Sequence, residues 1–401
     1  MQNVIGIVAE YNPFHNGHSL HLEDARARLG EESGVVCVMS GDFVQRGEAA
    51  VYSKFARAEA AVRCGADLVL ELPLPWALSS AEGFARGAVG LLGQIGVVTH
   101  LSFGSECGEI EPLRRVAEAL LDPGIGADIR AEMQTGDSFA AARQRAVSKR
   151  VGALAELLEA PNNILAVEYL KALYDQRLSL RPMTVRRAGA GHDAAGEGRL
   201  RSASELRSFL GAGRDIRPYV PALAANVYAR ETELGRGPVL PDALETAMLS
   251  RLRMLPREVY LALPDADEGL GNALYHAAHE EATLSAVLAA AKSRRYALSR
   301  LRRMTMCAAL GVASGMAEGT PPYARVLAAN ERGRGLLREM NERSAVPIVT
   351  KPAAARTLPE PVRGVFAHTA DAHDLYVLAY TAREERRCGG DWRRSPTMVS
   401  F

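Results

Sequence analysis

The chain has 401 residues, enough for two or three domains with ample core, and its 48 lysines and arginines almost balance its 47 aspartates and glutamates. A hydrophobic content of 48%, a charged content of 24% and a net charge of +1 are those of an ordinary soluble globular protein, without an overall charge signature for nucleic acid. Five widely spaced cysteines without a CxxC pair argue against a disulfide framework and a zinc site, and no run approaches about 18 apolar residues, so we expect a cytoplasmic protein without a membrane span.

The first half of the chain alternates apolar runs with amphipathic segments. We predict strands over residues 4–9, 35–39, 68–72 and 97–103, and helices over residues 20–29, 54–64, 80–95 and 112–121. This alternation is typical of βαβ units, so we predict an α/β fold with a parallel sheet. Ligand sites in such sheets lie at the carboxyl ends of the strands.

The first strand is followed by the octapeptide Tyr11-Asn12-Pro13-Phe14-His15-Asn16-Gly17-His18. The Asn-Pro pair indicates a turn, and a glycine at the start of a helix lets the backbone approach a phosphate closely. The pattern resembles the HxGH signature of the nucleotidylyltransferase superfamily. There the two imidazoles stabilise charge on the α- and β-phosphates as pyrophosphate leaves, because imidazole donates hydrogen bonds and can carry charge near neutral pH. The alternative is a turn whose histidines only cap the helix.

The second strand leads into Ser40-Gly41-Asp42 and a glycine-flanked loop that ends at Glu48. Lys54 and Arg57 follow about one helical turn apart, a spacing at which both could face one anionic ligand; the alternative is a solvated helix face. Glu71, at a strand end, is either a buried orienting carboxylate or a surface cap.

Two further motifs carry polar residues at predicted helix starts. Asn162 and Asn163 precede an apolar helix, where they either cap the helix or contact a ribose or adenine through their amides. In Ser202-Ala203-Ser204-Glu205-Leu206-Arg207 a serine can cap a helix whose N–H groups, with the Arg207 guanidinium, could take phosphate oxygens. This motif resembles the (S/T)-x-(S/T)-x-(I/L)-R element of nucleotidylyltransferase domains, and the alternative is ordinary capping. The long gap between HxGH and this element implies an insertion.

The character of the chain changes near residues 210–220, after a Gly- and Ala-rich stretch over residues 187–201 that we predict to be a mobile loop. Strand runs become scarce, so we predict a catalytic domain over residues 1–215 and a mainly helical domain over residues 216–401. The second part carries basic clusters with interleaved aromatic residues. They suit phosphate contact and base stacking, or a salt-bridged helix face. The clusters are Lys292, Arg294, Arg295, Tyr296, Arg300, Arg302 and Arg303; residues 383–387; and Trp392, Arg393 and Arg394.

One ordered series of motifs covers essentially the whole chain: EYNPFHNGH, SGDFVQRGE, GADLVLELP, FGSE, PNNILAVEY, RRAGAGHD and SASELR, with ARVL, ERG and VPIVTK towards the C-terminus. The series resembles the bacterial tRNA(Met) cytidine acetate ligases. The resemblance implies a Rossmann-like nucleotidylyltransferase (HUP-type) domain followed by a mainly helical, tRNA-binding domain. It also implies an enzyme that activates acetate with ATP, accompanied by Mg²⁺, to acetyl-adenylate. The acetyl group then goes to the exocyclic amine of the wobble cytidine of elongator tRNA(Met).

The resemblance also assigns site residues. His15, His18 and Arg207 are expected to be catalytic. The family's arginine before a Gly-Ala-Gly turn corresponds to Arg187. Because an aromatic residue common in the family is absent before His192 and Asp193, Arg186 is the alternative. No residue is assigned to a metal. The expected ATP-binding residues are Ile7, Val8, Ala9, Glu10, Tyr11, Asn12, Pro13, Phe14, His15, Asn16, Gly17, His18, Ser19, Leu20, Gly104, Asn162 or Asn163, Arg187, Ser202 and Ser204.

The residues fit catalysis by positioning and electrostatic stabilisation. The chain has no G-x-S-x-G elbow and no convincing catalytic cysteine, which argues against a covalent acyl-enzyme. Two other functions are compatible with the motifs: a coenzyme-forming small-molecule adenylyltransferase, which would not need the helical half, and a non-catalytic RNA-binding protein with a relic nucleotide pocket. The sequence indicates no protein partner. Charge reversal at Arg294, Arg295, Arg302 and Arg303 is expected to weaken tRNA binding and spare acetyl-adenylate formation.

Overall fold

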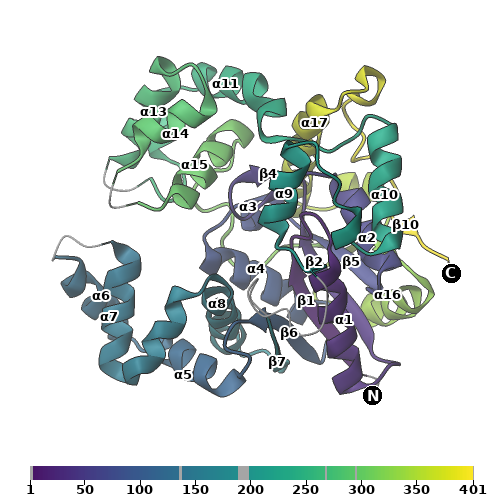
Figure 1. Cartoon of the computed structure of the whole chain (residues 1–401), viewed down its shortest axis with the longest axis horizontal. Helices are drawn as coiled ribbons and strands as arrows, with labels where there is room; N and C mark the ends of the chain where they lie inside the picture. The colour runs from purple at the N-terminus through teal and green to yellow at the C-terminus, as the bar shows by residue number, and fades with distance from the viewer. Residues whose placement is uncertain (1–2, 135–137, 188–197, 267–268, 294–295, 401) are drawn as a thin grey trace.

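A computed structural model describes residues 3–134, 138–187, 198–266, 269–293 and 296–400. Most of the predicted loop over residues 187–201, including His192 and Asp193, lies outside the described residues. The same holds for Arg294 and Arg295. At the centre of the described chain is an eight-stranded sheet in the order β10-β8-β5-β2-β1-β6-β7, with β9 beside β8 (Figure 1). Its strands are β1 (Val4–Ala9), β2 (Gly34–Ser40), β5 (Leu68–Leu72), β6 (His100–Ser105), β7 (Arg181–Arg186), β8 (Ala324–Ala329), β9 (Ile348–Val349) and β10 (Thr397–Met398). A separate hairpin pairs β3 (Phe43–Val44) with β4 (Glu48–Ala49).

The predicted α/β class and parallel sheet are confirmed. Strand β1 pairs in parallel with both β2 and β6, so their carboxyl ends lie at one edge of the sheet. Strands β1 and β5 have the predicted bounds. Strand β6 begins at His100 rather than at residue 97, because Thr99 bonds the backbone of Val4 through its hydroxyl, with oxygen–nitrogen and oxygen–oxygen distances of 2.9 and 3.0 Å.

The C-terminal part of the chain also contributes to this sheet. Strand β8 is fully buried and runs antiparallel to β5, with an irregularity between Val69 and Leu70, while β9 and β10 pair with β8. The strand scarcity read from the sequence missed β8, because a buried run of six residues has no periodicity that separates it from a helix segment. The boundary near residue 215 stays a prediction, and strands from both sides of it share the sheet.

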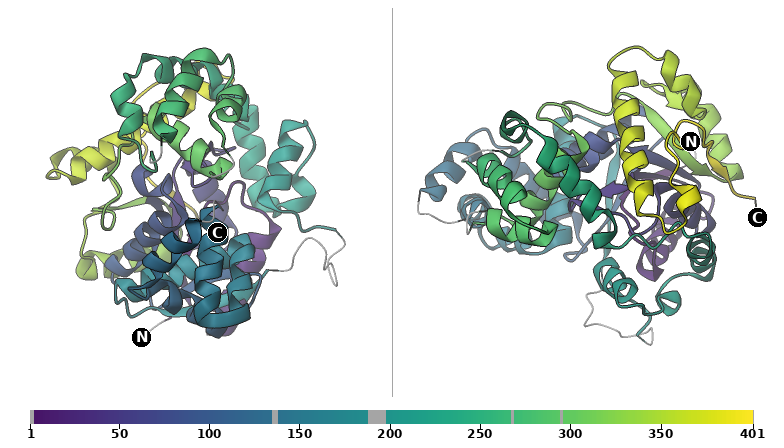
Figure 2. Two further views of the ribbon diagram at one scale, coloured as in Figure 1. Left: turned by 90° about the vertical axis from the view of Figure 1, so that its left-hand side faces the viewer. Right: turned by 90° about the horizontal axis from the view of Figure 1, so that it is seen from above.

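Helices cover both faces of the sheet, as the two views of Figure 2 show. One face packs against α1 and α2 around a core that includes Ile5, Ile7 and Phe55. The other face packs against α4, α8 and α16 around a core that includes Val36 and Leu70. The helices are α1 (Asn16–Leu29), α2 (Lys54–Arg63), α3 (Leu74–Ala77), α4 (Ala81–Gln94), α5 (Ile110–Leu121), α6 (Ile125–Met133), α7 (Phe139–Val151), α8 (Pro161–Asp175), α9 (Ala203–Gly211), α10 (Ala222–Glu233), α11 (Glu245–Met254), α12 (Arg257–Leu261), α13 (Leu270–Glu280), α14 (Leu284–Ala291), α15 (Leu298–Leu310), α16 (Glu331–Arg343) and α17 (Val362–Tyr376). Short 3-10 helices lie at Gly152–Glu159, Arg217–Tyr219, Pro241–Leu244, Pro352–Thr357, Val377–Ala379 and Arg383–Glu385.

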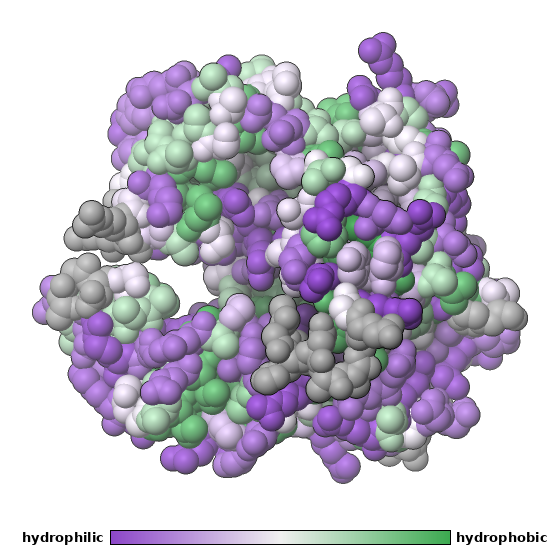
Figure 3. All heavy atoms as spheres, in the orientation of Figure 1, coloured by the Kyte–Doolittle hydropathy of each residue, from purple (hydrophilic) through white to green (hydrophobic). Residues whose placement is uncertain are grey.

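The helices α11 to α15 form a lobe that is joined to the sheet domain through the β3–β4 hairpin and α17. Their shared core contains Phe43 of the hairpin, Leu301 of α15 and Tyr376 of α17. The space-filling view shows a notch between this lobe and the lobe that carries α6 and α7 (Figure 3). Across the described ranges, no helix has both the length and the apolar character needed to cross a membrane.

Candidate active site

The turn between β1 and α1, residues 10–18, is here called the histidine turn. His15 is the N-cap of α1, and its Nδ1 accepts a hydrogen bond from the Gly17 N–H at 3.1 Å. The His15 N–H in turn donates to Nδ1 of His18 at 3.3 Å. Because each Nδ1 is an acceptor, the proton of each neutral imidazole is on Nε2. The turn therefore fixes both histidines as Nε2–H donors, with ring centroids 3.8 Å apart.

His15 is only 3% exposed, and its Nε2 has no hydrogen-bond partner among the described residues. An unpaired buried donor is costly unless a ligand satisfies it. Burial and the positive charge of Arg187 lower the pKa of His15 to about 3, and burial also lowers the pKa of His18. Without a ligand both rings are therefore neutral at pH 7, so they offer an anion N–H donors, whereas the sequence analysis allowed them to carry charge.

The rest of the histidine turn is held by its neighbours. Tyr11 and Phe14 are buried in the core, and the Phe14 N–H donates to the Tyr228 hydroxyl of α10 at 2.8 Å. Not all of the predicted segment faces the site: the Ser19 hydroxyl bonds Glu23 at 2.8 Å, and Leu20 is exposed. Sequence reasoning missed His21, one turn further along, whose Nε2 lies 2.9 Å from the Ser102 hydroxyl.

Strand β6 brings a second group to the same sheet edge. The Arg187 guanidinium donates to Oδ1 of Asn162 at 2.9 Å, and its side chain crosses Gly104, where a Cβ atom would stand 2.9 Å from Arg187 Cγ and Cδ. A glycine is therefore needed at 104 for this close approach. Arg186 instead packs over Gly108, so the structure brings Arg187, the first choice of the sequence analysis, towards the histidines.

Neither asparagine of the Asn-Asn pair is the N-cap of α8. That place belongs to Ala160, and the Glu106 carboxylate instead accepts the N–H groups of Asn162 and Asn163 at 3.2 and 2.8 Å. Asn163 is buried, and its Oδ1 accepts a hydrogen bond from the Cys107 N–H. Asn162 is therefore the asparagine that contacts Arg187. The role of Glu106 was not recognised from the FGSE motif, because it depends on where α8 begins.

Helix α9 brings Arg207 to the histidine turn. Ser202 is the N-cap of α9 and forms a capping box with Glu205, so its hydroxyl is engaged in ordinary capping. Arg207 donates to the Ser204 hydroxyl and to the carbonyl oxygen of Asn12, at 3.1 Å in each case. The two motifs predicted from sequence therefore meet in space.

The family model described as HIGH Nucleotidyl Transferase matches residues 1–390. A tRNA(Met) cytidine acetate ligase of Acetivibrio thermocellus is 34% identical over 98% of this chain and 99% of its own length, and one of Caldanaerobacter subterraneus is 37% identical over 94% and 95%. This chain belongs to the tRNA(Met) cytidine acetate ligase family.

Solved structures of the family agree with this assignment. Thermotoga maritima TmcAL bound with alpha-thio ATP is 33% identical, has a TM-score of 0.92 and is matched over 99% of both chains. The apo form of the same protein has a TM-score of 0.93 over 99% of this chain. The fold class predicted for the family is therefore confirmed.

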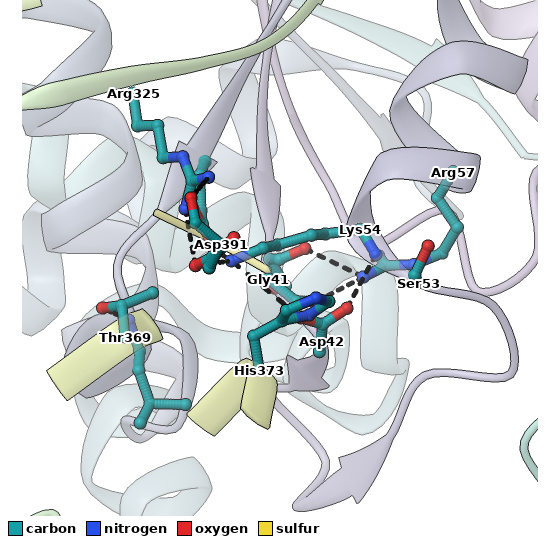
Figure 4. A network of polar contacts seen from close by, with 12 residues as sticks. Gly41, Asp42, Ser53, Lys54, Arg57, Arg325, Thr369, His373 and Asp391 are labelled. Carbon is teal, nitrogen blue, oxygen red and sulfur yellow. Dashed lines mark hydrogen bonds and ion pairs between the residues drawn. The ribbon is translucent and has the colours of Figure 1, made fainter. Parts of the chain in front are cut away.

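A buried polar network around Lys54 and Arg57 lies next to the histidine turn, and it contradicts one prediction. Lys54 and Arg57 form neither a solvated face nor a pair turned towards one ligand, because both are buried and bonded to other groups of this chain (Figure 4). Lys54 Nζ lies 2.7 Å from both Glu71 Oε1 and Asp391 Oδ2. Arg57 donates to backbone carbonyl oxygens, including those of Ser40, Gly41 and Glu10. Glu71 takes the buried alternative left open by the sequence.

The same network ties the C-terminal segment to the sheet. Arg325 of β8 binds Glu71 and Asp391 at 3.1 and 2.7 Å, and His373 of α17 bonds Asp42 at 2.8 Å. Although burial opposes it, the charges of Lys54 and Arg325 hold the pKa of the Asp391 carboxyl well below its usual range. Sequence reasoning missed these partners. Over the described residues, no group of three or more His, Cys, Asp and Glu side chains is placed to hold a metal ion.

The basic cluster of α15 is partly engaged within the chain. Arg303 lies 3.3 Å from Asp265, and Arg302 Nη1 lies 2.6 Å from Glu48, a residue whose other oxygen is 3.6 Å from Arg207. One carboxylate therefore connects Arg302 to Arg207, and the expectation that charge reversal at Arg302 spares acetyl-adenylate formation stays a prediction.

Proposed function

We propose that this protein uses ATP to activate acetate as acetyl-adenylate and transfers the acetyl group to the exocyclic amine of the wobble cytidine of elongator tRNA(Met). The observation that carries the proposal is the histidine turn, in which two Nε2–H donors, one of them buried and unpaired, lie at a helix N-terminus. The names of the relatives supply the substrate class.

In the first step an acetate oxygen attacks the α-phosphorus, and the bond from this phosphorus to the oxygen that bridges to the β-phosphate breaks. The negative charge that develops on leaving pyrophosphate is stabilised by the Nε2–H groups of His15 and His18 and by Arg207. When bound, Mg²⁺ would accompany the triphosphate and neutralise part of its charge.

In the second step the cytidine amine attacks the acyl carbon, loses a proton and displaces AMP. The nucleotide lies at the histidine turn, with Gly104, Asn162 and Arg187 at its flank. Arg187 contacts the adenylate, a role supported by its fixed position between Gly104 and Asn162. Residues 1–215 supply the adenylation chemistry and residues 216–401 supply most of the tRNA contacts. With tRNA as the substrate, the reaction takes place in the cytoplasm.

The proposal is tested first at the adenylation step. Pyrophosphate release is measured with ATP and acetate, and separately with ATP and nicotinamide or pantetheine phosphates. Acetate-dependent release supports the ligase. Release that depends only on a phosphorylated coenzyme precursor would instead show a coenzyme-forming adenylyltransferase, and no release in any mixture would leave an RNA-binding protein.

A further inference from the structure

The β3–β4 hairpin is bonded on one side to the histidine turn. The Gln45 N–H donates to the Glu10 carboxylate at 2.9 Å, and the Val51 N–H, just beyond the hairpin, donates to Oδ1 of Asn12 at 2.8 Å. Both acceptors lie a few residues before His15. The hairpin is therefore fixed to the segment that presents the two histidines.

The other side of the hairpin rests on α15. Gly47 has a φ of +73°, and a Cβ atom there would lie 2.5 Å from both the carbonyl carbon of Arg302 and the nitrogen of Arg303. Backbone thus meets backbone at this point, and a side chain at position 47 would separate the hairpin from the helix. Figure 1 shows β4 between α15 and α9.

Glu48, next to this contact, has one carboxylate oxygen for each of two arginines. Its Oε1 accepts from Arg302 Nη1 at 2.6 Å, and its Oε2 lies 3.6 Å from Arg207 Nη2. Glu48 is 30% exposed and Arg207 is 19% exposed, so these pairs are only partly screened by water. The closer partner, Arg302, limits where the carboxylate can lie.

We infer that Glu48 is a positioning residue for Arg207, and that Arg302 of α15 holds Glu48 in place. This inference rests on the proposed function, in which Arg207 faces the triphosphate. Glu48 supplies one of the contacts that orient the guanidinium, with Asn12 and Ser204 supplying the others. The lobe of α11 to α15 thereby sets the geometry of the adenylation step, and a small displacement of a charge-stabilising donor is costly to the rate.

The test compares Glu48→Gln, Arg302→Gln and Arg207→Ala, alone and in pairs, by acetate-dependent exchange of pyrophosphate into ATP without tRNA. We expect Glu48→Gln to lower kcat about 5- to 10-fold, with a smaller change in KM for ATP, and Arg302→Gln to lower it about 3-fold. In the Arg207→Ala background neither change has a further effect, and Glu48→Gln with Arg302→Gln is no worse than Glu48→Gln alone. Glu111→Gln, which removes an exposed pair with Arg114, is the matched control and leaves kcat unchanged.

A purely structural role would lower the melting temperature and give losses that add to those of Arg207→Ala. Additive losses, or a kcat of Glu48→Gln equal to that of the unaltered protein, overturn the inference. If exchange is absent and the proposed function fails, the inference is tested by the ATP affinity of the same variants, measured by calorimetry without acetate. Non-additive losses of affinity at Glu48 and Arg207 support the inference, and additive or absent losses overturn it.

Discussion

Arg207 Nη1 donates a hydrogen bond to the carbonyl oxygen of Asn12, 3.1 Å away, although 195 residues separate the two in the chain. Asn12 lies three residues before His15, so this bond ties the guanidinium to the histidine turn. Because the Asn12, Ser204 and Glu48 contacts leave part of the five-donor fork available, Arg207 can also contact an anion at the histidine turn.

Replacing Arg207 by alanine is expected to cost about 2–4 kcal/mol of transition-state stabilisation, or roughly 30- to 1000-fold in kcat/KM for ATP, the range for loss of a charge-stabilising donor. The reason is that the variant lacks the Arg207 guanidinium, whose positive charge stabilises the leaving pyrophosphate. Steady-state pyrophosphate release measures the effect. Unchanged turnover and unchanged ATP dependence would make Arg207 only a surface residue.

Replacing Gly104 by alanine is expected to raise the KM for ATP with little change in the free energy of unfolding, because the new Cβ displaces Arg187 from Asn162. Gly335→Ala, at a position with no atom within 4 Å of the added carbon, is the control. In an Arg187→Ala background, Gly104→Ala should have no further effect on KM. Equal losses in both backgrounds would contradict this role of Gly104.

The histidine turn should make stability depend on pH in the ligand-free protein. The pKa of His15 is about 3 in the folded state and about 6.5 when unfolded, so the unfolded state binds the extra proton first as the pH falls. Stability is therefore lost from about pH 6.5 downwards, by about 2 kcal/mol from this residue at pH 5. Urea unfolding of His15→Asn should show a slope of free energy against pH shallower by up to about 1.4 kcal/mol per pH unit. A slope equal to that of the unaltered protein would contradict the lowered pKa.

Asp391→Asn is expected to destabilise the fold by about 3–5 kcal/mol, because it leaves Lys54 and Arg325 with only part of their buried negative charge. Denaturant unfolding measures the loss, and Glu360→Gln, which removes an exposed pair with Arg363, should change stability by less than about 1 kcal/mol. A loss at Asp391 no larger than that of the control would show that the network does not hold the C-terminal segment.

Charge reversal at Lys292, Arg294 and Arg295 is expected to weaken tRNA binding and make its salt dependence shallower by about 1 per lost phosphate contact. Arg302 is left unchanged, because its pair with Glu48 connects it to Arg207. Acetyl-adenylate formation without tRNA should persist. Unaltered tRNA affinity, or a joint loss of adenylation and tRNA binding in a folded variant, would contradict the assignment of this cluster.

Local patterns predicted the strand edge, because an apolar run before a turn specifies β1. The recognisable spacings of His15, His18 and Arg207 also located them at the starts of α1 and α9, whereas their catalytic roles stay predictions. It could not predict which residues become partners across the fold. Lys54 and Arg57 have the spacing of an anion site, yet carboxylates of β5 and the C-terminal segment bind Lys54, and backbone carbonyl groups beyond β1 and at the end of β2 bind Arg57. The pairing of Glu48 with Arg302 likewise depends on how a lobe more than 200 residues away docks on a hairpin.

Acetylation of tRNA(Met) is tested most directly by incubating the protein with ATP, radiolabelled acetate and total tRNA and then digesting the tRNA to nucleosides. We expect label in acetylated cytidine from tRNA(Met), dependent on ATP and absent with folded His15→Ala or His18→Ala protein. Label that never enters cytidine, or near-normal labelling by both histidine variants, would contradict it.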